Sequence, residues 1–99
     1  ITIPDSVTSI GDEAFSCCYG LTDIVLPDTL TFIGTYAFGE CTNIKNITIP
    51  SSVMHMEESP FRGWTSEQTI YVQGRTSAPD TWHNHWDDGC AAKIVWNAE

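Results

Sequence analysis

The chain has 99 residues, of which 41% are hydrophobic and 17% are charged, and this composition is typical of one folded domain. Thirteen acidic residues against four basic ones give a formal net charge of −9, which disfavours nucleic acids and anionic membranes as partners because both attract positive charge. No apolar run approaches the roughly 18 residues that cross a bilayer, so we expect no membrane insertion.

The sequence repeats itself every 23 residues over most of its length. Residues 21–43 are the clearest copy, and apolar residues recur in register before and after it. The recurring positions are Ile1, Ile24, Ile47 and Ile70; Ile3, Leu26, Ile49 and Val72; Val7, Leu30 and Val53; Ile10, Ile33 and Met56; and Phe15, Phe38 and Phe61. Repeats of roughly 20–50 residues are typical of solenoids, in which each unit buries its apolar side against its neighbours. We therefore predict a single domain, residues 1–99, with repeats at about 1–20, 21–43 and 44–66 and a closing segment at 67–99.

Each repeat is predicted to begin with a short strand. Residues 1–3 place two isoleucines on one face and a threonine on the other. The equivalent residues in the later repeats are 24–26, 47–49 and 70–72. Residues 94–96 follow by a further 24 positions, so we expect them to form the last strand of a parallel ladder. A short helical turn is expected after each strand, at residues 12–15 in the first repeat, with its acids where the peptide dipoles favour them.

The closing segment is predicted to seal the last coil. Residues 78–86 are expected to form a short helix with Trp82 and Trp86 on one face, ended by Gly89. Terminal repeats of solenoids need an atypical closing unit, and the large apolar area of tryptophan suits that role.

The pattern L-x-x-I-x-L/I-P-x-x-L/V-x-x-I-G-x-x-A-F-x-x-C resembles the BspA-like branch of the leucine-rich repeats. In the second repeat the matching residues are Ile24, Leu26, Pro27, Leu30, Ile33, Gly34, Ala37, Phe38 and Cys41. The resemblance covers roughly residues 1–64. It implies an α/β fold: a right-handed leucine-rich-repeat solenoid in which short strands form a parallel ladder and short helical turns connect them.

The same resemblance implies a non-enzymatic module for adhesion or protein binding. Members of this family are generally bacterial surface or secreted proteins, so we expect a secreted or cell-surface location and a protein partner or host surface ligand. The atypical last segment favours the C-terminal end of a longer repeat array. An alternative stays open, in which the chain is a structural cap of such an array with no ligand of its own.

The candidate binding face combines strand residues that point away from the core with residues at the strand starts. The first group contains Thr2, Val25, Thr48 and Tyr71, and the second contains Asp23, Asn46 and Thr69. Stacked in register they form one outer face, and solenoids bind partners with such surfaces. The alternative is that β-branched residues occur here because they are good strand formers.

No cofactor, metal site or catalytic centre is predicted. Metal-ligating residue types cluster at His83, His85, Asp87 and Asp88. No further spaced ligand pair accompanies them, so we interpret them as a polar surface around packed tryptophans. Cys90 lies near these histidines in the sequence, but nothing predicts that they are held together as a nucleophile and its base.

Cys18 and Cys41 occupy the same repeat position, so they are expected to stack on adjacent coils. A strand spacing of about 4.8 Å would allow a disulfide between them. We favour free thiols that fill a buried niche, because four scattered cysteines do not form a dense disulfide framework.

The first strand begins at Ile1, so its backbone groups lack an upstream partner in this chain. An unpaired edge of this kind favours pairing with another chain, whereas the net charge of −9 opposes it. We therefore expect a monomer at low salt that self-associates through residues 1–7 when salt screens the charge.

Overall fold

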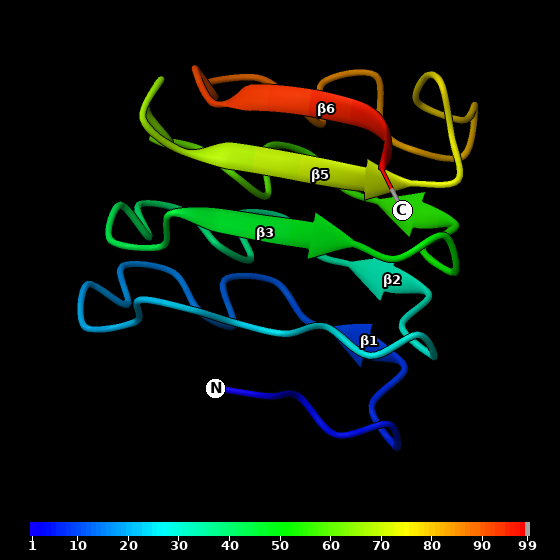
Figure 1. The fold of residues 1–99 in the computed structure, drawn as a ribbon, viewed down its shortest axis with the longest axis horizontal. Helices are drawn as coiled ribbons and strands as arrows, with labels where there is room; N and C mark the ends of the chain where they lie inside the picture. Colours follow the sequence, from blue (N-terminus) through cyan, green and yellow to red (C-terminus); the bar gives the residue numbers. More distant parts are fainter. Residues whose placement is uncertain (99) are drawn as a thin grey trace.

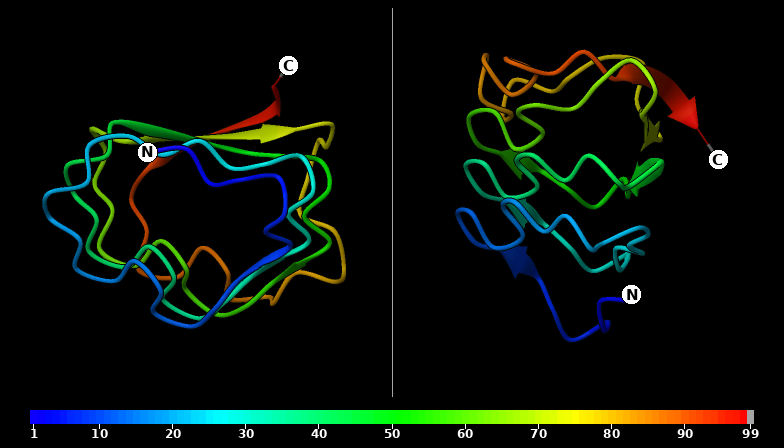
Figure 2. Two further views of the ribbon diagram at one scale, coloured as in Figure 1. Left: turned by 90° about the horizontal axis from the view of Figure 1, so that it is seen from below. Right: turned by 90° about the vertical axis from the view of Figure 1, so that its left-hand side faces the viewer.

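The structure, a computed structural model, describes residues 1–98, which wind into a solenoid with one coil per repeat (Figure 1). Within these residues six strands form two parallel sheets. The first sheet contains β1 (Ser9–Ile10), β2 (Phe32–Ile33) and β4 (His55–Met56), and the second contains β3 (Asn46–Ile49), β5 (Thr69–Gln73) and β6 (Lys93–Ala98). Figure 2 shows the coils around a common interior and, from the side, stacked from the N-terminal to the C-terminal end. Glu99, the last residue of the predicted domain, lies outside the described residues.

Neighbouring coils lie in the register that the 23-residue period predicts. Strands β1, β2 and β4 align Ile10, Ile33 and Met56 in one row. Strand β5 pairs with β6 through Ile70 and Ile94, which confirms the predicted last strand. A repeat solenoid with parallel pairing between coils is therefore confirmed.

The ladder of the second sheet is interrupted between the second and third coils. Thr2 and Val25 form an isolated parallel bridge, and β3 pairs with β5. No pairing joins residues 24–26 to β3 in the part of the chain that the structure describes. The prediction of one continuous ladder is wrong at this step, and the two coils are separate on this face.

The helical turns predicted after each strand and the helix predicted at residues 78–86 are also wrong, because the described chain contains no helix. An α-helix directs each N–H to a carbonyl four residues back in its own chain. Here alternate N–H groups in these segments donate to a neighbouring coil instead. The amide of Phe15 donates to the Ala37 carbonyl at 2.8 Å, and that of His83 donates back to the Met56 carbonyl at 2.7 Å. Bonding between coils takes the donors that a helix would use, so the fold is a parallel β-solenoid rather than α/β.

The same turns place residues with positive φ at fixed repeat positions. Glu13, Tyr36 and Ser59 have φ angles of 57°, 55° and 52°, and Cys17 and Glu40 have φ angles of 59° and 61°. A residue with a side chain adopts this region at a cost of about 1–2 kcal/mol. The cost recurs because these residues turn the backbone so that its amides reach the neighbouring coil. Their positive φ angles are incompatible with a right-handed helix.

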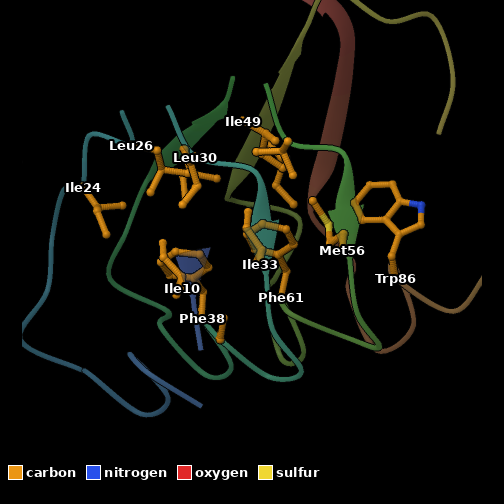
Figure 3. Packing of buried hydrophobic residues seen from close by; sticks show 14 of the residues in the cluster. Ile10, Ile24, Leu26, Leu30, Ile33, Phe38, Ile49, Met56, Phe61 and Trp86 are labelled. Carbon is orange, nitrogen blue, oxygen red and sulfur yellow. The ribbon is translucent and has the colours of Figure 1, made fainter. Parts of the chain in front are cut away.

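Stacked phenylalanine rings from the first three coils form the centre of the core, and Figure 3 shows two of them, Phe38 and Phe61. Phe38 is fully buried, with its ring centroid 5.5 Å from that of Phe15 and 5.7 Å from that of Phe61. The three rings are nearly parallel, with interplanar angles of 1° and 7°. Trp64 packs edge-on against Phe61 and donates its indole N–H to the Phe38 carbonyl at 2.8 Å. The repeat position of these rings therefore faces inward in the first three coils.

Tryptophan side chains pack together in the last coil, within the segment that is predicted to close the solenoid. Trp82 and Trp86 are buried, their rings meet edge-on at 5.0 Å, and Trp96 packs against both. Gln68 is also buried, and its amide nitrogen donates to two carbonyls of the preceding coil at 2.9 and 2.8 Å. The last coil thus covers apolar area while its buried polar group stays hydrogen-bonded.

Replacing Phe38 with alanine should lower the free energy of unfolding by about 3–5 kcal/mol, because the cavity would lie between two stacked rings. The matched control is Phe32→Ala, since Phe32 is only half-buried on β2 and should cost less. Urea unfolding of both variants measures the difference. A loss below about 1 kcal/mol for Phe38→Ala would contradict the stacked core.

Gly34 and Gly11 occupy the same repeat position but differ in their surroundings. A Cβ at Gly34 would lie 2.6 Å from the Asp12 nitrogen and 2.7 Å from the Gly11 carbonyl carbon, whereas a Cβ at Gly11 would meet no atom within 4 Å. We expect Gly34→Ala to destabilise the fold by about 1–3 kcal/mol through overpacking. Gly11→Ala should change stability by less than about 0.5 kcal/mol. Equal losses in urea unfolding would show that the coils are not packed this closely.

Candidate functional site

The structure brings four of the seven residues of the predicted binding face together on two neighbouring strands. Asn46 lies opposite Thr69, and Thr48 lies opposite Tyr71, in the parallel pairing of β3 with β5. The residues between them in each strand are buried, so the side chains of these four point outward. We call the outer side of β3 and β5, together with residues 23–25 and Thr2, the strand face.

The other three predicted residues lie across the interruption of the ladder. Thr2 and Val25 are exposed and paired with each other, and Val25 keeps 55% of its surface in solvent. Asp23 lies just before Val25, and its carboxylate is 3.1 Å from the terminal ammonium of Ile1. The seven residues of the predicted face therefore lie in two groups, one on each side of the interruption.

A groove with a volume of about 300 Å³ separates the two halves of the strand face. Its lining contains three predicted face residues, Val25, Asn46 and Thr48. Its other lining residues are Ile24, Leu26, Asp28, Pro50 and Gln73. Sequence reasoning missed the groove because it assumed an unbroken ladder, in which residues 24–26 would contact β3 directly.

The groove has a mixed lining and a negative charge. Among residues 1–98, Asp28 is the charged residue of its lining, and no lysine, arginine or histidine lines it. Asn46, Thr48 and Gln73 contribute amide and hydroxyl groups, and Val25 and Pro50 contribute apolar surface. The lining can therefore accept hydrogen bonds from a cation or an amide and can also contact an aliphatic side chain.

The histidine-rich closing segment has a structural arrangement of its own. His85 Nδ1 lies 3.1 Å from a carboxylate oxygen of Asp88, and His83 Nδ1 accepts the amide N–H of His85 at 3.0 Å. Within residues 1–98 no three His, Cys, Asp or Glu side chains converge as metal ligands would. Cys90 is half-buried, and burial raises the pKa of its thiol above the ordinary value of 9.0. A raised pKa lowers the fraction of reactive thiolate at neutral pH.

The four cysteines are free thiols in very different surroundings. Cys17 is exposed, Cys18 is half-buried and Cys41 is fully buried, with its sulfur 2.9 Å from the Phe15 carbonyl oxygen. Burial raises the pKa of the Cys41 thiol above 9.0. Folding therefore favours the neutral thiol over the thiolate. The contribution of Cys41 to the free energy of unfolding is fully present below the pKa of its thiol in the unfolded chain. It is lost as pH rises through the pKa of the thiol in the folded protein.

The comparison with protein families gives one match. The family described as "BspA type Leucine rich repeat region (6 copies)" matches residues 1–80, which are most of the chain. No curated protein and no solved structure matches the chain. None of the described residues belongs to a helix that is long and apolar enough to cross a membrane.

Thiol labelling should follow the order of burial in the folded protein. We expect Cys17 to react first and Cys41 last, because Cys41 is inaccessible and its pKa is raised. All four thiols should react after unfolding without a reductant. Mass spectrometry of labelled peptides gives the order and the count, and a deficit of two thiols in denaturant would establish a disulfide.

Proposed function

Because this chain belongs to the BspA-type leucine-rich repeat family, we propose that it is a non-enzymatic module that binds a protein partner or a host surface ligand through its strand face. The family is one of repeat modules that are often associated with surfaces and adhesion. We therefore also propose that the protein acts outside the cell, secreted or held at the cell surface.

The grooved strand face is the observation that carries this proposal. It exposes Val25 and Thr48 on either side of the groove, with amide and carboxylate groups beside them. The apolar side chains of the same strands, such as Ile47 and Ile49, are buried inside the coils. The surface is therefore rigidly supported from below and offers polar and apolar contacts together, as protein-binding surfaces do.

A purely structural role is the second candidate, and the closing segment favours it. Trp82 and Trp86 are about 95% buried although they lie in the last coil, so tryptophan covers the apolar interior here. A cap of this kind protects the core of a repeat array without contacting any ligand. The two candidates differ in whether the strand face contributes binding energy.

Self-association through the first coil stays a prediction. Ile3, Val7 and Phe15 line a hollow of about 260 Å³ beside the first strand, and Ile1 keeps 54% of its surface in solvent. An apolar surface of this kind supports the expectation that the monomer associates when salt screens its charge.

Selection of displayed random peptides on the immobilised protein tests the proposed function. Enriched peptides should bind in solution, and Tyr71→Ala should weaken them by about tenfold, because aromatic side chains dominate binding energy at such faces. The matched control is Tyr19→Ala, since Tyr19 is 56% exposed and lies off the strand face. Failure to enrich any peptide, or equal binding by Tyr71→Ala and the wild type, would favour the structural cap.

A further inference from the structure

The interruption of the ladder leaves two strand edges facing each other across the groove. Val25 directs its backbone groups toward the first coil: it accepts the N–H of Ile3 at 3.0 Å and donates to the Ile1 carbonyl at 2.9 Å. Successive residues of a strand turn their N–H and C=O to opposite sides. The backbone groups of Ile24 and Leu26 therefore point toward β3.

Strand β3 presents the complementary edge. The Lys45 carbonyl accepts the N–H of Thr69 at 3.0 Å, so the odd-numbered residues of this segment bond to β5. By the same alternation Asn46 and Thr48 turn their backbone groups toward the groove. Within residues 1–98 no backbone hydrogen bond crosses from residues 24–26 to β3. Unpaired backbone groups of this kind can hydrogen-bond a ligand that enters the groove.

The exposure of the side chains shows that the groove reaches the outermost apolar residues of the core. Ile24 and Leu26 keep 6% and 8% of their surface in solvent, whereas Ile47 and Ile49 at the equivalent positions keep 1% and 0%. The groove therefore gives access both to backbone groups and to apolar surface.

We propose that this groove binds an extended segment of a partner protein that carries an arginine or lysine side chain. The segment lies along the outer side of the groove. Its cationic side chain enters the groove, where it donates to the unpaired carbonyl groups of Leu26 and Thr48 and meets the carboxylate of Asp28. This inference rests on the proposed function and specifies the partner of the same face.

Two observations favour an extended cationic segment over other ligands. The backbone carbonyl groups of Ile24 and Leu26 face the groove, where they can accept hydrogen bonds from a guanidinium or ammonium group. The charge is also complementary, since Asp28 is the charged group of the lining and the whole chain carries a formal net charge of −9.

The experiment titrates the 99-residue protein, labelled with nitrogen-15, with a blocked pentapeptide of sequence Thr-Val-Arg-Val-Thr and follows its amide resonances by NMR. The peptide should shift the amides of Leu26 and Thr48. A matched peptide with glutamate in place of arginine should bind at least about tenfold more weakly, because its charge repels Asp28. Asp28→Asn should weaken the arginine peptide by about tenfold. Asp5→Asn is the matched control, because Asp5 occupies the same repeat position one coil earlier and lies outside the groove.

The possible results separate this inference from the function on which it rests. Shifts at Thr69 and Tyr71 without shifts at Leu26 and Thr48 would overturn the groove site while leaving binding by the strand face intact. Equal affinity of the Asp28→Asn variant and the wild type would overturn the role of the carboxylate and with it the cationic partner. If no amide resonance shifts at millimolar peptide, the inference is overturned. The selection of displayed peptides would then be the remaining test of the proposed function.

Discussion

Backbone hydrogen bonding between neighbouring coils is the constraint on which the rest of the structure depends. In the turns that carry the phenylalanine rings the amides donate to the following coil: that of Phe15 donates to the carbonyl of Ala37, and that of Phe38 donates to the carbonyl of Pro60, both at 2.8 Å. A row of such bonds fixes the spacing and register of the coils. The stacking of the phenylalanine rings at 5.5 and 5.7 Å follows from that spacing, because equivalent residues are held one above another.

The sequence was informative about the interior because the interior depends on periodicity. The 23-residue spacing of Phe15, Phe38 and Phe61 predicts that they share one environment, and the structure stacks them. It was misleading about the turns, where acidic residues and an alanine favour a helix locally. The competing partner for each amide lies 22 or more residues away, so local propensity cannot reveal it. Tyr36 at a φ of 55° shows the outcome, since an aromatic residue gives no sequence signal for that conformation.

The strand face was predictable in part for the same reason. Alternation along a strand predicts that Thr48 and Tyr71 point outward, and their pairing in β3 and β5 agrees. The groove was not predictable, because a missing backbone pairing has no side-chain signature: Val25 and Thr48 are both good strand formers. Asp28 gained a candidate role only when the structure placed it beside the opening. Which residues bind a partner is a separate question that the binding experiments address.

Native-state amide hydrogen exchange tests most directly the claim that bonding between coils supports the fold and is absent at one step of the strand face. The amides of Phe38 and Glu40, which donate to the next coil at 2.8 Å, should exchange slowly, near the rate of global unfolding. The amides of Leu26 and Thr48 should exchange much faster, although the Leu26 side chain is largely buried. Equal protection of Leu26, Thr48 and Phe38 would contradict the account, because it would mean that the ladder is continuous and that no edge is free for a partner.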